Sequence, residues 1–287
     1  MYRVFSPRRH VRVAVAVLAL CVTVATVWHL PSAPVTARPT EGIAVPIVMY
    51  HSILADPARQ GKYVITPQQF EQDLRYLREN GYTTVVVADL IAYVREGKPL
   101  PDKPVMLTFD DGYYNNFHYA HPLLQQYGMQ AVLSPIGTWS EHYSAHPDEC
   151  DHDNYSHLTW EQLRQMAQSG VWEIQNHSYD LHHIDGGQKG AAKRTDESES
   201  GYRLRLKNDL SAAQALLREQ VGVTPTCFTY PYGAYSTASQ AVLEEMGFCA
   251  SLSCEERTAV LTRDPACLWR LGRYLRPADK DVATILQ

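Results

Sequence analysis

The chain has 287 residues, of which 45% are hydrophobic and 20% are charged. This length and composition suit one large globular domain, or two small ones, with a substantial buried core. The formal net charge is −5. The chain therefore lacks the overall positive field that attracts nucleic acid, and we expect no nucleic-acid partner.

The N-terminal segment departs from this average. Four arginines precede an apolar run over residues 13–30, and no acidic residue precedes Glu41. A helix of that length reaches roughly 27 Å, close to the thickness of a bilayer's hydrocarbon core, and positive charge ahead of it keeps that end cytoplasmic. We expect residues 1–30 to be a basic stub and single-pass transmembrane anchor in the cell membrane. A signal peptide cleaved near residues 35–37, followed by secretion, is the alternative.

A proline-rich stretch follows. Pro31, Pro34 and Pro39 lie among small and polar residues, which is typical of a stalk over residues 31–44. From this point the rest of the chain is exported if the anchor is oriented as expected. We predict a single catalytic domain over residues 45–287.

The first half of this domain opens with a continuous apolar run at 47–50, which predicts a buried strand. Thr66, Pro67 and Gln69 then form a capping box ahead of a helical pattern that ends at Gly81. The pattern continues, in chain order, with a strand at 83–87, a helix at 89–96, a strand at 104–109, a helix near 121–127 and a strand at 131–135.

The second half repeats the alternation. A second capping box at Thr159 opens a helix that ends at Gly170. Residues 186–201 show no periodicity, which indicates an exposed insertion. The remaining elements are a strand at 171–176, a helix at 202–220, a strand at 226–230, a helix at 237–246 and short apolar runs near 248–252 and 268–274. Such alternation predicts an α/β fold with a parallel sheet that closes as a barrel, with its chemistry at the C-terminal strand ends.

Two adjacent carboxylates, Asp110 and Asp111, end the strand at 104–109 and precede Gly112. Buried carboxylates at such a position are costly unless a cation holds them. Consecutive side chains diverge at a strand end, so one carboxylate can bind a metal while the other faces the attacking water. An ordinary Asp-Gly turn is the alternative.

Three histidines, His177, His182 and His183, follow the strand at 171–176. Imidazoles at the end of a parallel strand are good ligands for zinc and similar ions. One carboxylate with two histidines leaves coordination positions open, as a catalytic metal site requires. A third segment, Thr229 to Gly233, also follows a predicted strand, and its unusual turn can direct a backbone N–H into the site.

These motifs together resemble the polysaccharide deacetylase family, the NodB-homology carbohydrate esterases of family 4. The resemblance covers roughly residues 45–275 and implies a distorted (β/α) barrel. It makes Asp110 the general base and Asp111, His177 and His182 the metal ligands, with His183 as a fallback. The five-residue step between the histidines, with Leu181 between them, is similar to the branch that deacetylates poly-β-1,6-N-acetylglucosamine in biofilms.

The resemblance also implies roles around the metal. The backbone N–H of Tyr232 would contribute to the oxyanion site beside Pro231. Tyr179 would contact substrate from within the histidine loop, and His51 would line the site or serve in packing. The metal would be zinc, with cobalt, nickel and iron also compatible with the donor set.

Two positions depart from the family pattern. The family's third motif often carries an arginine that orients the base, and this sequence has Thr229 there. The late motif that supplies a general-acid histidine has no match, because the corresponding stretch at 268–273 contains no histidine. Asp110 acting as base and then as acid would fill that gap.

The resemblance implies metal-dependent N-deacetylation of an N-acetylglucosamine polysaccharide, with release of acetate. A peptidoglycan deacetylase, an O-acetyl esterase and a weakly active surface glycan-binding protein remain alternatives, and the oligomeric state stays open. Cys254 and Cys267 flank a loop between two late strands and are the first candidates for a disulfide in an exported protein. Their burial as small hydrophobic residues is the alternative.

Overall fold

The computed structural model describes residues 42–286. Residues Gly42–Gln287 form a compact unit of their own. The predicted anchor and most of the predicted stalk lie outside the described residues. Within residues 42–286, no helix combines the length and the apolar character that crossing a bilayer demands.

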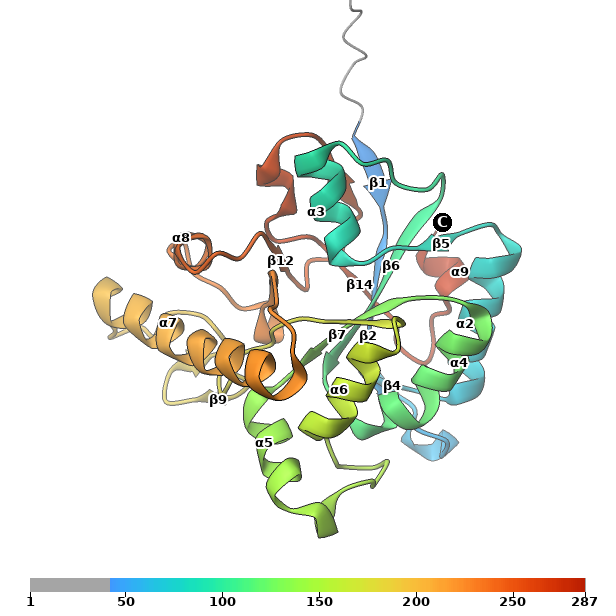
Figure 1. The fold of residues 1–287 in the computed structure, drawn as a ribbon, viewed down its shortest axis with the longest axis horizontal. Coiled ribbons are helices and arrows are strands. Elements are labelled where there is room, and N and C mark those ends of the chain that lie inside the picture. Colours follow the sequence, from blue (N-terminus) through green and yellow to red (C-terminus); the bar gives the residue numbers. More distant parts are fainter. Residues whose placement is uncertain (1–41, 287) are drawn as a thin grey trace, which may run out of the picture. The chain divides into compact units, whose positions relative to one another are not determined.

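The centre of the unit is a parallel sheet (Figure 1). Its strand order is β14 (Tyr274–Leu275), β2 (Ile47–Tyr50), β6 (Pro104–Asp111), β7 (Ala131–Pro135) and β8 (Trp172–Ile174), with β5 (Thr83–Thr84) also paired to β6. Only two residues of the strand predicted at 83–87 form β5, because the next helix already begins at Val87.

A second parallel pair closes this sheet into a ring. It consists of β11 (Cys227–Thr229) and β12 (Ala250–Leu252). A parallel bridge from Asn176 to Phe228 joins β11 to the end of β8, and a bridge from Leu252 to Leu271 joins β12 to the segment that leads into β14. The predicted distorted barrel is confirmed, and the distortion lies at the two places where a single bridge replaces a ladder.

Helices cover the outside of the barrel. The main outer core packs strands against α2 (Pro67–Glu79), α4 (His121–Tyr127), α6 (Trp160–Gln168) and α9 (Val282–Ile285). A separate core packs β11 against α7 (Glu199–Leu216) and α8 (Ser239–Glu245). Both predicted capping boxes are present, since Thr66 accepts from the Gln69 amide and Thr159 from the Gln162 amide.

The bottom of the barrel is closed by α3 (Val87–Glu96) and by the antiparallel pair of β1 (Ile43–Val45) with β13 (Ala259–Leu261). Two short strands, β3 (Ser52–Ile53) and β4 (Val64–Ile65), pair beside the barrel. A small hairpin of β9 (Ile184–Asp185) and β10 (Gln188–Lys189) leads into the predicted insertion, and only its second strand falls within residues 186–201.

The short α9 has no counterpart in the sequence prediction, and neither does α5 (Gly137–Ala145). Its buried residues are Gly137, Ser140 and Tyr143, so its inner face lacks the aliphatic periodicity by which an amphipathic helix is recognised. It directly follows β7 at the C-terminal end of the barrel.

The strand β6 is buried along its whole length and alternates in a way that sets up the site. Val105, Leu107 and Phe109 belong to the outer core, whereas Met106 belongs to the core inside and beneath the barrel. Thr108 and Asp110 share the inward face with Met106 because side chains alternate along a strand. The strand therefore ends with a carboxylate that faces the interior.

Candidate active site

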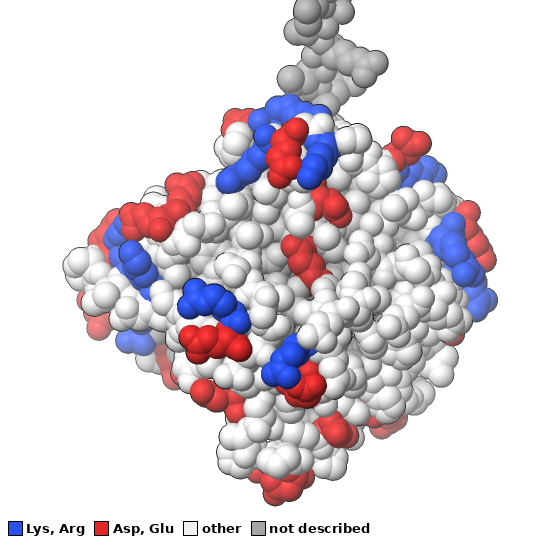
Figure 2. Space-filling model, viewed as in Figure 1, with Lys and Arg blue, Asp and Glu red and all other residues white. Residues whose placement is uncertain are grey.

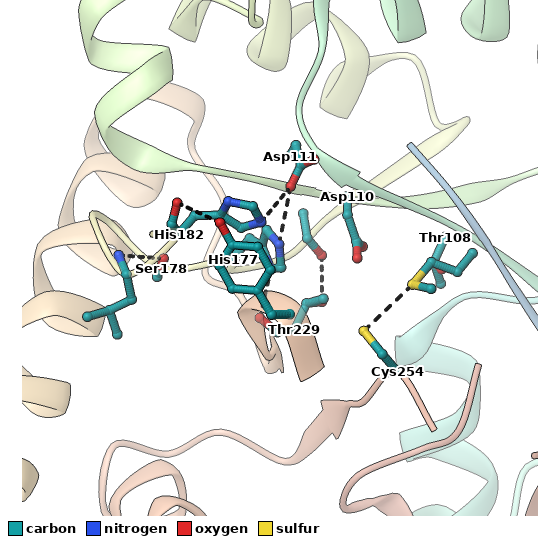
Figure 3. A network of polar contacts seen from close by, with 12 residues as sticks. Thr108, Asp110, Asp111, His177, Ser178, His182, Thr229 and Cys254 are labelled. Atoms are coloured by element: carbon teal, nitrogen blue, oxygen red, sulfur yellow. Dashed lines mark hydrogen bonds and ion pairs between the residues drawn. The ribbon is translucent and has the colours of Figure 1, made fainter. Parts of the chain in front are cut away.

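Asp110 and Asp111 diverge at the end of β6 (Figure 3). Asp111 has a φ of 70°, in the left-handed region that non-glycine residues rarely occupy. Ser178 and Tyr232, on the two other loops of the site, also have positive φ values of 79° and 58°. Strained backbone of this kind persists where the surrounding structure fixes a functional geometry.

Asp111 meets the two predicted histidines. Its Oδ1 lies 3.4 Å from His177 Nε2 and 3.2 Å from His182 Nε2. The ligand atoms of these residues all lie within 4.8 Å of one another. Asp111 Oδ1 is buried and accepts no hydrogen bond from any described residue. An orphaned carboxylate oxygen facing two imidazoles fits a divalent cation, so the residues present suit the metal that the resemblance implies.

A backbone carbonyl on the side of the ring away from Asp111 fixes the tautomer of His177. Its Nδ1 lies 2.8 Å from the carbonyl oxygen of Thr229. Because a carbonyl can only accept, Nδ1 is the donor, and the lone pair of Nε2 faces Asp111 when the ring is neutral. This is the arrangement of a metal-binding histidine with an outer hydrogen-bond partner.

The five-residue histidine step has a packing cause. Leu181, at the position where the family usually has its second histidine, is 3% exposed and packs in the core with Tyr202 and Phe228. His182 then faces Asp111. His183 instead lies 3.5 Å from Asp185 and takes no part in the donor set.

Asp110 is held by an arginine that the sequence analysis missed. Arg273 Nη1 donates to Asp110 Oδ1 at 2.7 Å, and Nη2 donates to Oδ2 at 2.8 Å. Arg273 has no exposed surface and also donates from Nε to the Ser253 carbonyl. This two-pronged contact orients the carboxylate in the way expected of the missing arginine. Position 229 is occupied differently, since the Thr229 hydroxyl pairs with Ser134 at 2.8 Å.

The charges of the site keep both carboxylates ionised. Burial acts to raise the pKa of Asp110, but the guanidinium of Arg273 outweighs it and the net pKa is lowered. Burial likewise acts to raise the pKa of Asp111. Its interactions with His177, His51 and His182 outweigh burial, so the pKa of Asp111 lies well below that of an ordinary aspartate. An ionised pair of carboxylates suits one ligand and one base.

His51 lies at the rim of the same site. Its backbone follows β2, where Tyr50 pairs with Phe109, so His51 stands beside Asp110 in the register. Its Nδ1 is buried with no partner among the described residues. Its ring packs against Tyr63 at 4.8 Å between centroids. Burial lowers the pKa of His51, opposed by the charges of Asp111 and Asp110.

Of the other predicted site residues, some lie at the donor set and one is turned away from it. The ring of Tyr232 lies 4.4 Å from that of His182, directly at the donor set, and Pro231 begins the turn that carries it. Tyr179 is turned toward α5, where its hydroxyl donates to Glu141 Oε2 at 2.6 Å. A role of Tyr179 in binding substrate stays a prediction.

The predicted disulfide is wrong. Cys254 and Cys267 are both free. Cys254 lies at the site, 3.7 Å from Arg273 Nη2 and 4.0 Å from the sulfur of Met49, whereas Cys267 contacts the backbone of Thr262. The two flank the same loop in sequence but face different neighbours.

Sequence comparison places this site in a known family. Residues 97–251 match the polysaccharide deacetylase family. The poly-β-1,6-N-acetyl-D-glucosamine N-deacetylase of Escherichia coli K12 is 31% identical over 218 residues, which cover 70% of this chain and 32% of the relative. The chain thus spans about a third of that relative's length. The enzyme of the same name from Staphylococcus aureus N315 is 23% identical over 195 residues, covering 68% of this chain and 62% of that protein.

Solved structures agree with the sequence. The de-N-acetylase of Aggregatibacter actinomycetemcomitans superposes with a TM-score of 0.73 at 26% identity, covering 85% of this chain and 99% of that one. IcaB from Ammonifex degensii gives 0.67 at 26% identity, with 83% and 94% covered. With its barrel, its paired aspartates and its two site histidines, this chain belongs to the polysaccharide deacetylase family, whose members hydrolyse N-acetyl amide bonds.

Proposed function

We propose that the chain is a divalent-metal-dependent N-deacetylase of a poly-β-1,6-N-acetylglucosamine-type polysaccharide. One observation carries the proposal: an ionised aspartate clamped by Arg273 stands directly beside the Asp111–His177–His182 donor set. A base next to a metal site is what hydrolysis of an unactivated amide requires. The substrate class follows the printed names of the relatives.

The chain's own residues divide the reaction between them. A bound divalent cation, zinc in our proposal, would act as a Lewis acid toward the acetamide carbonyl and would make water more acidic. Asp110 takes the proton of the attacking water as the new C–O bond forms. The oxygen of the tetrahedral intermediate accepts from the backbone N–H of Tyr232. Cleavage of the C–N bond then gives acetate and the free amine of the sugar.

Asp110 also supplies the acid that the late part of the sequence lacks. Having taken the proton of the attacking water, it returns that proton to the leaving nitrogen as the C–N bond breaks, so the carboxylate is regenerated in each turnover. His51 lines the same end of the barrel beside Asp110, and its buried Nδ1 has no partner among the described residues. Arg273 and the double role of Asp110 together account for the two positions at which the sequence departs from the family, which removes the reason to prefer a glycan-binding protein without turnover.

The substrate is a neutral or weakly charged polymer rather than a nucleic acid. Figure 2 shows basic and acidic side chains interspersed on the face it presents, with no large patch of either sign. We further propose that residues 1–30 anchor the domain outside the cytoplasm, where such polymers occur. Protease digestion of intact and permeabilised cells tests this placement: cleavage of the domain only after permeabilisation contradicts it.

Acetate release by the purified full-length protein tests the activity. The substrates are β-1,6-linked N-acetylglucosamine oligomers, chitin oligomers and peptidoglycan, each before chelation, after chelation and after zinc is restored. We expect chelator-sensitive release that is greatest from the β-1,6 oligomers. Greater release from peptidoglycan would reassign the substrate, and release that survives complete chelation would overturn the metal dependence.

The donor set is tested by metal content. Asp111→Ala, His177→Ala and His182→Ala each remove one of the three ligands, so we expect loss of stoichiometric zinc by mass spectrometry of the native protein together with loss of turnover. His183→Ala is the matched control, because His183 faces Asp185 and should leave zinc unchanged. Zinc loss in His183→Ala but not in His182→Ala would show that His183, and not His182, is the metal ligand.

A further inference from the structure

A line of packed aromatic rings leads away from the donor set. Tyr113 packs on His157 with 4.7 Å between centroids, and His157 packs on Trp139 at 5.2 Å with the two planes only 12° apart. The loop that carries His157 is fastened to β6, because the Leu158 amide donates to the Gly112 carbonyl at 2.8 Å. The line therefore starts at Tyr113, two residues beyond the paired aspartates.

The inner end of this line lies beside the reaction centre. Tyr113 directly follows Gly112, and its backbone forms an antiparallel bridge with His157. His157 is 8% exposed, and its Nδ1 has no partner among the described residues. At the outer end, Trp139 is 43% exposed. Its inner face rests on a buried imidazole, and a large part of the indole remains open to solvent.

Trp139 is also held in position relative to the histidine loop. It lies in the first turn of α5, where the Gly137 amide donates to Ser178 O at 3.0 Å and the Thr138 amide donates to Tyr179 O at 2.9 Å. A Cβ at Gly137 would lie 2.9 Å from Tyr179 Cδ2 and 3.1 Å from its Cα, so only glycine permits this approach. The helix start and the loop between His177 and His182 thus form one rigid piece.

We propose that Trp139, supported by His157 and Tyr113, is a binding subsite for a sugar ring next to the one that is deacetylated. The inference rests on the proposed function, because it identifies how a polymer rather than a single sugar is held. The C–H groups on one face of a pyranose carry partial positive charge, and an indole face is negative and rigid, so the two stack. Where the neighbouring sugar has already lost its acetyl group, its ammonium adds a cation–π attraction to the same ring.

The test compares Trp139→Ala and Trp139→Phe with the wild type in the full-length, zinc-loaded protein. Tyr155→Ala is the matched control, because Tyr155 is 53% exposed in the same loop region and its ring stacks on His152, which is not part of the line. The substrates are a β-1,6-linked N-acetylglucosamine tetramer and 4-nitrophenyl acetate, which is too small to reach the subsite.

For Trp139→Ala we expect KM for the tetramer to rise about threefold to tenfold, with kcat and the kcat/KM for 4-nitrophenyl acetate unchanged. Trp139→Phe should recover most of the loss, and Tyr155→Ala should match the wild type. An equal loss on both substrates would show that Trp139 only supports the fold of the site, and an equal rise in KM for Tyr155→Ala would show that the effect is not specific. Either result overturns the subsite.

Failure of the proposed function is recognised separately. It is the absence of acetate release by the wild type from every polymer. In that case, calorimetric titration of the tetramer decides: weaker binding in Trp139→Ala but not in Tyr155→Ala supports the subsite. Equal binding by all three proteins, or no binding by the wild type, rejects it.

Discussion

Two buried arginine–aspartate pairs stand at the two ends of β14, and only one of them belongs to the active site. Arg273 contacts both carboxylate oxygens of Asp110, at 2.7 and 2.8 Å. Arg276 contacts both oxygens of Asp73, at 2.7 and 3.1 Å. All four residues are 3% exposed or less. The chemistry of the ion pair is the same in both, so the surroundings must account for the different roles.

The difference lies in what else each carboxylate accepts. Asp73 also accepts from the Tyr50 hydroxyl at 3.1 Å and from the Val282 amide at 3.3 Å, which ties α2 to β2 and to the start of α9. Asp110 accepts only from Arg273 among the described residues. An ionised carboxylate has about four acceptor sites, so Asp73 is saturated and Asp110 keeps acceptor capacity for a water proton. Asp73, whose acceptor sites are all used, therefore serves as a structural clamp, whereas Asp110 has free acceptor sites and can serve as a base.

The sharpest way to break this comparison is to neutralise each carboxylate. Asp110→Asn removes the proton acceptor, and we expect kcat to fall roughly 10²- to 10⁴-fold, the usual range for loss of a general base. Bound zinc should remain, because Asp111, His177 and His182 are intact. Rates of acetate release per folded, zinc-loaded molecule measure this, and unchanged turnover would exclude Asp110 as the base.

Asp73→Asn should show the opposite profile. It leaves the Arg276 guanidinium buried without its counter-charge, which destabilises proteins by about 3–5 kcal/mol. Turnover per folded molecule should stay close to that of the wild type. Urea unfolding at pH 7 gives the free energy of unfolding. A loss of turnover comparable to that of Asp110→Asn, measured where the variant is fully folded, would contradict the division into clamp and base.

A milder change separates charge from geometry. Arg273→Lys keeps a positive charge but loses the fork that fixes both oxygens of Asp110. We expect kcat to fall about tenfold, because a base must be held within a fraction of an ångström, with KM little changed. Arg276→Lys is the matched control and should lower stability without lowering kcat. Equal kcat values for the two lysine variants would leave Arg273 without an orienting role.

A partly buried carboxylate, Glu173, sharpens the comparison because no arginine pairs with it. Glu173 on β8 accepts from the Ala88 amide at the start of α3 and from Gln175. Burial raises its pKa to about 7. In the folded protein Glu173 thus stays protonated to a higher pH than in the unfolded chain, so its contribution to stability falls as pH rises from about 4.5 to about 7 and is constant above that.

Glu173→Gln removes this titration. Relative to the variant, the wild type should lose roughly 1–2 kcal/mol of unfolding free energy between pH 5 and pH 8, discounted from about 1.4 kcal/mol per pKa unit. Urea unfolding of both proteins across this range measures the difference. A difference that does not change with pH would mean that Glu173 is ionised throughout.

The sequence was sufficient where the signal was local. The capping boxes at Thr66 and Thr159 located two helices, and the alternation of elements predicted the barrel. The positions of Asp110, Asp111, His177 and His182 at strand ends predicted that they would meet, because the C-terminal ends of parallel strands share one rim.

Long-range contacts carried no such signal. Arg273 lies 163 residues from Asp110, in the stretch where the family pattern led us to look for a histidine. No local sequence pattern indicates that an arginine there will be buried inside the barrel. The helix α5 was missed because glycine and serine form part of its buried face. The pairing of Cys254 with Cys267 failed because a shared loop does not determine which side chains face each other.

The ion pair between Asp110 and Arg273 also bears on how the chain reaches its active state. It joins β6 to β14, and β14 closes the ring against β2. Contacts of such large sequence separation carry a high loop-closure entropy and form late. In a refolding experiment, enzymatic activity should therefore return after the helical circular dichroism signal, so that catalysis itself reports the moment at which the barrel closes.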